Sequence, residues 1–346
     1  MMKHTREPHK HLEIGPVSLR WHPRRVSFVL IALALALGLG SIALITGAYT
    51  LSPAEILEVF RGLGDARSTL VVMEIRLPRL LTALLVGGAL AGSGMLLQGI
   101  VRNPLVSPDI IGINAGAGLM AILLYVYRIP TYLVAPAAFA GALAAALIIY
   151  GLTWKGHISI PRLVLVGIGV NAIFGALTTY MTLVGRSEDI ARAYQWLAGS
   201  LYDSGWDDVA ILAISMALLV PLGSMLLHPL RVIQLGDSQA KAVGVRLETV
   251  RFGLLLISCG LAAVAVSATG PIGFVALMVP HLARMIAGPI RSSVWFLSMA
   301  LGGILVLGAD MITLHLLPFE LPAGIITSAL GAPYFLYLLY RTGVKL

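Results

Sequence analysis

Very few residues of this sequence combine in a pattern that could carry out catalysis. The sequence has no phosphate-binding GxxxxGK[ST] loop, no zinc-binding HExxH pair and no GxSxG nucleophile turn. Its eight histidines are scattered. The single cysteine, Cys259, lies in an apolar run, so neither an intramolecular disulfide nor a thiolate metal site is expected. We therefore predict no catalytic residue, no metal site and no cofactor in this chain, which is not expected to be an enzyme or to bind ATP.

Asp310 is the one acidic residue that the sequence places well inside an apolar helix. A charge in hydrocarbon is costly and often functional, so a proton or cation relay is one interpretation. The favoured interpretation is a carboxyl group hydrogen-bonded to neighbouring backbone. If Asp310 did act as a relay, the chain could be an ion-coupled secondary transporter, which we keep as an alternative function. Such transporters usually gather several ion-binding groups near the membrane midplane.

Other polar residues within apolar runs have two interpretations each. His281 and Arg284 lie near the predicted cytoplasmic end of a helix, where Arg284 could extend to lipid headgroups or belong to a surface for a partner. For Asn114 and Asn171 we favour hydrogen bonds between helices over the lining of a polar conduit.

The elements that carry these residues are membrane helices. The chain of 346 residues is 58% hydrophobic and 12% charged, whereas soluble domains carry about 25% charged residues. Its apolar runs are continuous and about 20 residues long, which predicts an all-α, polytopic membrane protein with about ten transmembrane helices. The predicted spans are residues 26–48, 79–101, 109–127, 132–153, 162–184, 209–227, 252–268, 272–288, 293–316 and 321–340.

The distribution of positive charge predicts the orientation. On this topology 17 of the 24 Lys and Arg residues fall on one side, which accounts for the net charge of +8 without nucleic acid. Residues 1–25 are predicted to be a cytoplasmic tail, and residues 26–346 a single transmembrane domain. A break at Gly270-Pro271 gives an even number of spans and places both termini in the cytoplasm. Ser52-Pro53 is expected to start a short surface helix on the outer side.

The stretch from Arg76 to Gly118 carries the strongest local signals. Gly88 and Gly92 form a GxxxG pair, which lets two helices pack closely. Asn103 precedes a proline and should end the first helix. Ser107 should cap the next helix, with Pro108 at its first position. Further along, residues 232–245 are expected to form a short polar helix between glycines, in a loop that could equally be a solvated connector.

Several separated motifs resemble the FecCD/BtuC family of ABC-importer permeases. The resemblance runs from about Leu51 to Arg341 and rests on seven motifs in the same order: RLPR at 76–79, GALAGSGMLLQ at 88–98, NPLVSPDIIGINAGA at 103–117, WLAGSL at 196–201, LGDSQAKAVGV at 235–245, GPIGFVALMVPH at 270–281, and GAD with ELPAG at 308–310 and 320–324.

The resemblance implies a BtuC-like type II ABC importer fold with ten helices per subunit and a conduit on a dimer axis. The implied partners are a second permease copy (a homodimer or a close paralogue), two cytoplasmic ATP-binding subunits that hold ATP and Mg, and an extracytoplasmic substrate-binding protein. The implied cargo is an iron chelate, a ferric siderophore before haem or cobalamin. The implied location is the plasma (inner) membrane of a bacterium or archaeon.

The resemblance also assigns roles to particular residues. Arg76 and Arg79 match arginines that dock the binding protein. Asn103, Pro104 and Leu105 match the elbow of the cytoplasmic gate, and a second gate elbow falls at His157-Ile158-Ser159-Ile160. The segment matched to the ATPase-coupling helix contains Leu235, Gly236, Asp237, Ser238, Gln239, Ala240, Lys241 and Gly244.

The sequence departs from the family in one place. The family often has an arginine shortly after the GAD motif, where this chain has Leu314-His315. Docking is therefore expected to rely on Arg76 and Arg79, with Arg61 or Arg67 as further candidates. His315 could make docking sensitive to pH.

Overall fold

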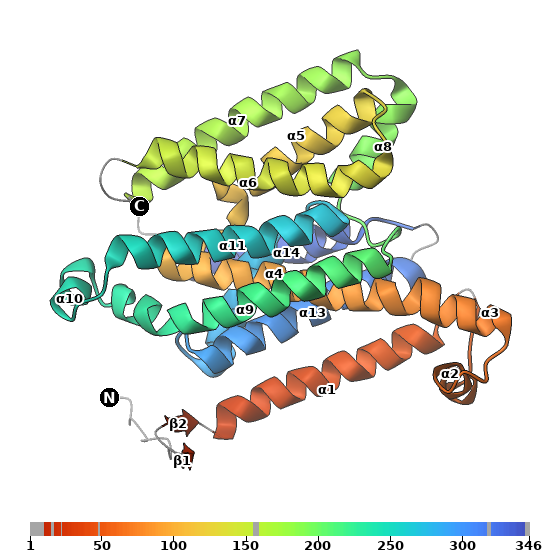
Figure 1. The fold of residues 1–346 in the computed structure, drawn as a ribbon, viewed down its shortest axis with the longest axis horizontal. Helices are drawn as coiled ribbons and strands as arrows, with labels where there is room; N and C mark the ends of the chain where they lie inside the picture. The colour runs from red at the N-terminus through yellow and green to blue at the C-terminus, as the bar shows by residue number, and fades with distance from the viewer. Residues whose placement is uncertain are drawn as a thin grey trace.

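The computed structural model describes residues 10–14, 17–21, 23–47, 49–154, 159–316 and 320–342, which form a bundle of long helices (Figure 1). An antiparallel hairpin, β1 (Lys10–Ile14) and β2 (Val17–Trp21), lies within the segment predicted to be a tail. The helical elements that follow are α1 (Pro23–Ile45), α2 (Pro53–Phe60), α3 (Ala66–Thr69), the π-helical η1 (Leu70–Arg76), α4 (Leu77–Val101), the 3-10 helix η2 (Pro108–Ile111), α5 (Ile113–Val126), the 3-10 helix η3 (Thr131–Leu133), α6 (Val134–Thr153), α7 (Ile160–Val184), α8 (Ser187–Leu197), α9 (Trp206–Gln234), α10 (Asp237–Ala242), α11 (Leu247–Thr269), α12 (Val275–Ala287), α13 (Ser292–His315) and α14 (Ala323–Thr342).

Membrane-spanning length is the main feature of these helices. Among the described residues, seven helical segments are long and apolar enough to cross a bilayer. Three shorter apolar helices lie at 113–126, 275–287 and 323–338. The all-helical, multi-pass class is therefore confirmed.

The helix boundaries differ from the predicted spans mainly around the inner loop. Helix α9 continues to Gln234, although its predicted end was at residue 227, and it contains Pro221 and Pro229. Proline is tolerated inside membrane helices because neighbouring groups can satisfy the freed carbonyl. Helix α11 also begins five residues before its predicted start, so the connector is shorter than the sequence suggested.

The turn at Gly270 is confirmed. Helix α11 ends at Thr269, and Gly270 has φ +71°, a conformation that favours glycine. A carbonyl oxygen of Trp196 lies where a Cβ on Gly270 would be, so any side chain there would collide with the backbone. Residues 252–279 therefore do not form one long helix.

The helix predicted at 109–127 is interrupted at its start. The 3-10 helix η2 ends at Ile111, and Gly112, whose φ is +73°, separates it from α5. The prediction that Ser107 caps this helix is wrong, because the Ser107 hydroxyl donates to the Asp109 carboxylate at 3.2 Å instead of accepting from the backbone. The Asn171 side chain donates to the Asp109 carbonyl at 3.0 Å, which confirms the predicted contact between helices.

Helix α4 occupies the centre of the bundle, and most of its side chains are buried. It approaches α13 most closely at Gly87 and Gly302, where a Cβ on either residue would overlap the carbonyl oxygen of the other. The predicted pair Gly88 and Gly92 also faces α13, and the Trp295 indole donates to the Gly92 carbonyl at 3.0 Å. Small residues thus allow the close packing that membrane helices require.

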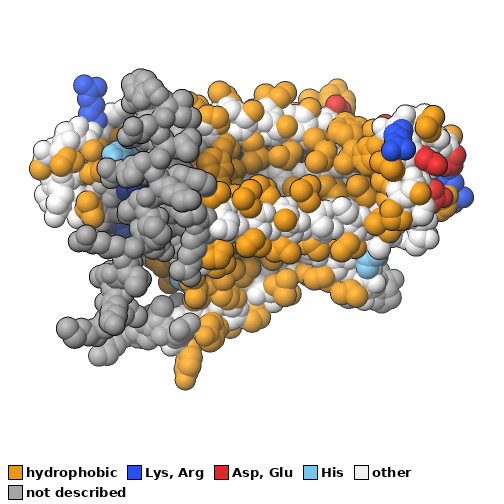
Figure 2. All heavy atoms as spheres, turned by 90° about the horizontal axis from the view of Figure 1, so that it is seen from below, with side chains coloured by type: hydrophobic (Ala, Val, Ile, Leu, Met, Phe, Trp, Pro, Cys, Tyr) orange, Lys and Arg blue, Asp and Glu red, His pale blue; other side chains and the backbone are white. Residues whose placement is uncertain are grey.

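Exposed apolar side chains form a band along several helices of the bundle. Helices α1, α7 and α9 bury few of their residues, and many of their apolar side chains are exposed. On the face in Figure 2, hydrophobic side chains cover the middle of the molecule, and charged side chains gather toward its ends. Such a band is suited to lipid or to another membrane subunit.

Candidate functional site

The predicted functional residues lie at the two ends of the bundle, and α4 connects them. Its 25 residues span about 37 Å at 1.5 Å per residue. Arg76 and Arg79 stand at its beginning, and Arg102 ends it. Figure 1 shows α2 and α3 at the end of the bundle where α4 begins, and α10 at the opposite end.

Arg76 is held by the end of a neighbouring helix. Its Nη1 donates to the carbonyl oxygens of Leu44 at 2.6 Å and of Ile45 at 3.4 Å, and its Nη2 donates to the carbonyl of Tyr49. The last carbonyls of a helix have no partner within it, so Arg76 caps α1. Its guanidinium therefore already has a structural role.

Arg79 forms a bidentate ion pair with Asp310. Its Nε donates to one carboxylate oxygen at 2.9 Å and its Nη2 to the other at 2.8 Å. The interpretation of Asp310 as a carboxyl bound to neighbouring backbone is therefore wrong. Arg79 also lines a hollow of about 270 Å³ with Gln195, Tyr202 and Glu320. Docking at Arg76 and Arg79 stays a prediction.

The predicted gate elbow follows directly from the end of α4. Arg102 adopts a left-handed conformation with φ +56° and ψ +30°, which is uncommon for a residue with a side chain. The Asn103 side chain then accepts a hydrogen bond from the Leu105 amide at 2.9 Å, which closes a tight turn around Pro104. The helix ends before the residue that precedes proline, so the elbow begins slightly earlier than predicted.

Only part of the second predicted elbow lies in the described structure. His157 and Ile158 lie outside the described residues. Ser159 has an extended backbone, and Ile160 begins α7. No hydrogen bond between described residues joins Ser159 or Ile160 to the elbow at 103–105.

The short helix expected in the inner loop is present as α10. Gly236 (φ +133°) and Gly244 (φ +82°) flank it and make the sharp turns at both ends. Leu235 and Val243 are 72% and 68% exposed, whereas Ala240 is buried against the bundle. The helix therefore has one face on the protein, and an exposed apolar side chain lies beyond each of its ends.

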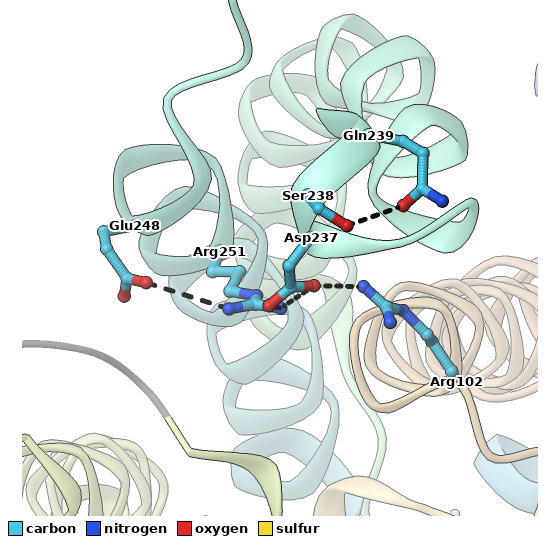
Figure 3. A network of polar contacts seen from close by, with 6 residues as sticks. All are labelled: Arg102, Asp237, Ser238, Gln239, Glu248 and Arg251. Carbon is cyan, nitrogen blue, oxygen red and sulfur yellow. Dashed lines mark hydrogen bonds and ion pairs between the residues drawn. The ribbon is translucent and has the colours of Figure 1, made fainter. Parts of the chain in front are cut away.

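Asp237 anchors α10 to two other helices (Figure 3). Both its carboxylate oxygens accept from Arg251 Nη2, at 2.8 and 2.9 Å, and one also pairs with Arg102. Partial burial acts to raise the pKa of Asp237, but the hydrogen bonds from Arg251 and Arg102 outweigh it, so the pKa lies below its usual value. Asp237 is therefore ionised at neutral pH.

A polar hollow of about 360 Å³ opens beside the elbow. Gln98 and Arg284 line it, and the Arg284 guanidinium donates to the Gln98 side-chain oxygen at 2.6 Å. The Gln98 amide in turn donates to the carbonyl of Leu277 on α12 at 3.0 Å. Arg284 therefore holds α4 and α12 together, and the prediction that it extends to lipid headgroups is not needed to explain it.

Sequence reasoning did not assign roles to Arg102, Arg251 or Gln98. Arg102 directly precedes the elbow motif, and this position is the only local signal that could have identified it. Its partner Asp237 lies 135 residues away, so the pairing could not be found from spacing.

Taken together, the fold and its polar ends define a multi-pass membrane protein. No group of three or more His, Cys, Asp or Glu residues comes together as a metal site within the described part of the chain. The polar contacts instead hold helix ends and two connecting segments in place.

The chain belongs to the FecCD transport family, whose model matches residues 31–341. It is 40% identical to the achromobactin transport system permease protein CbrC of Dickeya dadantii (strain 3937), over 91% of this chain and 92% of that protein. It is 38% identical to the hemin transport system permease protein HmuU of Yersinia pestis, over 93% and 97%. A metal-chelate type ABC transporter solved in an inward-facing conformation has a TM-score of 0.82 at 30% identity, covering 91% of this chain and 99% of that one.

Proposed function

We propose that this chain is the permease subunit of an ATP-driven importer that carries an iron chelate across the membrane. The observation that carries the proposal is its membership of the FecCD family over nearly the whole chain. Relatives with the same coverage are named for achromobactin and hemin transport, which favours a ferric siderophore, with haem or cobalamin as further candidates.

The importer would contain two permease subunits together with ATP-binding subunits and a substrate-binding protein. A second permease copy, identical or closely related, would complete the conduit, and the exposed apolar faces of α7 and α9 offer surface for it. Two cytoplasmic subunits would bind ATP and Mg, and an extracytoplasmic protein would deliver the chelate. The exposed Leu235 and Val243 beside α10 support docking of an ATPase subunit there, because apolar side chains at a polar end of the molecule suit a protein interface.

The proposed topology has ten spans with both termini in the cytoplasm. The seven long candidate spans support this number if the three shorter apolar helices are counted with them. The Arg102 end of α4 would face the cytoplasm and the Arg79 end the outside, in the plasma membrane of a bacterium or archaeon. This orientation follows the excess of positive charge on one side.

Within that topology Arg76 and Arg79 would meet acidic groups of the binding protein, and residues 103–105 would form the gate. Arginine pairs with carboxylates through two hydrogen bonds, which makes a specific docking contact. Since Arg79 already pairs with Asp310, docking would use its remaining donor positions or exchange one carboxylate for another.

A reconstituted complex tests the proposal. The permease, its ATPase and its binding protein would be placed in liposomes, and uptake of a ferric siderophore, haem and cobalamin would be measured with and without ATP. We expect ATP-dependent accumulation of an iron chelate, and none by the permease alone. Ion-driven accumulation by the permease alone would instead establish the alternative based on Asp310, which the buried ion pair with Arg79 already disfavours.

A further inference from the structure

One carboxylate, that of Asp237, links three helices near the predicted gate. Arg251 of α11 reaches it from one side, and its side chain is only 4% exposed. Arg251 also lies 3.7 Å from Glu248, so its own position is held from two directions. Arg102 of α4 reaches the same carboxylate from the other side (Figure 3).

Arg102 is also the residue at which the chain leaves α4. Its left-handed backbone, with φ +56°, sets the direction in which residues 103–105 depart. A residue with a side chain keeps this conformation only where its surroundings hold it there. The side-chain ion pair that Arg102 makes in the described structure is the one with Asp237.

Helix α10 is a short unit of six residues with few attachments to the rest of the bundle. Gly236 and Gly244 bound it, both with positive φ, and glycines of this kind can absorb changes in backbone angle. Among the described residues, Asp237 makes the only side-chain hydrogen bonds from α10 to other helices. A displacement of α10 would therefore act on the rest of the bundle through this carboxylate and the apolar contact of Ala240.

The geometry points to Arg102 as a positioning residue that ties the elbow at 103–105 to α10 through Asp237. When an ATPase subunit moves α10, the ion pair carries the movement to Arg102 and so to the backbone that begins the elbow. Arg251 keeps the carboxylate in place on the other side. The inference rests on the proposed function, because it takes α10 as the contact with the ATPase.

A purely structural role for Arg102 is the competing explanation, and the chain offers a matched control for it. Arg128 follows the end of α5, has the same φ of +56°, and forms an ion pair with Asp189 at 3.2 Å. It lies at the opposite end of the bundle, away from α10. Substitution of Arg102 or of Arg128 removes an arginine with a left-handed backbone together with its ion pair, but only Arg102 is connected to α10.

The experiment measures chelate uptake and ATP hydrolysis in the same liposomes that contain the whole importer. We expect Arg102→Gln to assemble and hydrolyse ATP but to transport about 2- to 30-fold less per ATP, the range found for residues that couple distant sites. Arg102→Lys keeps a charge for Asp237 and should retain most of the coupling. Arg128→Gln should leave transport per ATP unchanged.

Three outcomes would overturn the inference. They are an unchanged ratio in Arg102→Gln, an equal loss in Arg128→Gln, and an Arg102→Lys variant as poorly coupled as Arg102→Gln. The double variant Arg102→Gln with Asp237→Asn should transport no less per ATP than the poorer of the two single variants, because both substitutions remove the same contact. If Arg102→Gln does not assemble, the two ion pairs are removed from their other side. Asp237→Asn should lower transport per ATP and Asp189→Asn, the partner of Arg128, should not, and equal ratios would overturn the inference. A wild-type complex without ATP-driven uptake would refute the proposed function itself, which separates the two failures.

Discussion

Arg79 of α4 and Asp310 of α13 form an ion pair across the core of the bundle, through two hydrogen bonds of 2.9 and 2.8 Å. Their side chains are only 15% and 5% exposed. Arg79 was interpreted from the sequence as a docking residue and Asp310 as a carboxyl bonded to backbone or, less favoured, as a relay, and the two are partners. The pair joins the beginning of α4 to the last turns of α13, and the same two helices pack closely at Gly87 and Gly302.

Removal of either partner of this pair should destabilise the protein. Asp310→Ala leaves the Arg79 charge without its partner in a site with little water, which should cost about 3–5 kcal/mol. Thermal unfolding of the purified permease in detergent measures the effect. The double variant Arg79→Gln with Asp310→Asn should be much less destabilised than the sum of the single variants, whereas additive losses would contradict the pairing.

Charge reversal at the outer end should weaken docking of the binding protein. Arg76→Glu with Arg79→Glu should lower the affinity at low salt, and the difference should shrink as salt screens the charges. Because both arginines also hold the fold together, their loss could weaken docking indirectly. Arg61→Glu tests the charge effect separately, since it changes an exposed residue at the end of α2. Arg162→Glu, in the first turn of α7 at the other end, is the control. Equal affinity in all variants would count against docking at this end.

The turn before α10 should not tolerate a side chain. Gly236 has φ +133°, and a Cβ there would collide with the Gln239 side chain. Gly236→Ala should therefore distort the start of α10, at a cost of about 1–3 kcal/mol, and reduce transport per ATP. Gly205→Ala is a matched control, because its Cβ would meet no atom within 4 Å. Normal coupling in Gly236→Ala would argue that the shape of α10 does not matter for transport.

The coupling contact at Asp237 should be insensitive to pH across the physiological range. The pKa of this carboxyl is lowered in the folded protein, so its stabilising contribution is complete above the unfolded value of about 3.9. The contribution is lost only as the pH falls through the still lower folded value. Titration of Asp237 should therefore cause no change in transport per ATP between about pH 5 and 8. A titration in that interval that disappears in Asp237→Asn would contradict this assignment.

The close packing of α4 on α13 should be sensitive to a single methyl group. Gly87→Ala would place a Cβ against the Gly302 carbonyl, and overpacking of this kind costs about 1–3 kcal/mol. Gly175→Ala on α7, where a Cβ would meet no atom within 4 Å, should be neutral or slightly stabilising. Thermal unfolding in detergent compares them, and equal stability would show that α4 and α13 can separate without loss.

Local signals in the sequence predicted much of the backbone. The capping box at the start of α2 is present, with the Glu55 amide bonded to the Ser52 hydroxyl at 3.2 Å. The turn at Gly270 and the short helix between Gly236 and Gly244 are also confirmed. The end of α9 was missed because Pro229 and nearby basic residues suggested a loop, whereas the helix continues through both.

The sequence by itself also determined the fold class, through its hydropathy, and predicted the orientation, through its charges. The runs of apolar residues specify a multi-pass helical protein, and the distribution of Lys and Arg predicts its orientation, because both properties are summed over neighbours in the chain. The partners of the polar side chains depended on the tertiary structure. Arg79, Arg102 and Gln98 find theirs 231, 135 and 186 residues away, so only the packing of the helices could select them. A charge in a membrane helix must be neutralised or bonded, but its position along the chain does not say by which residue.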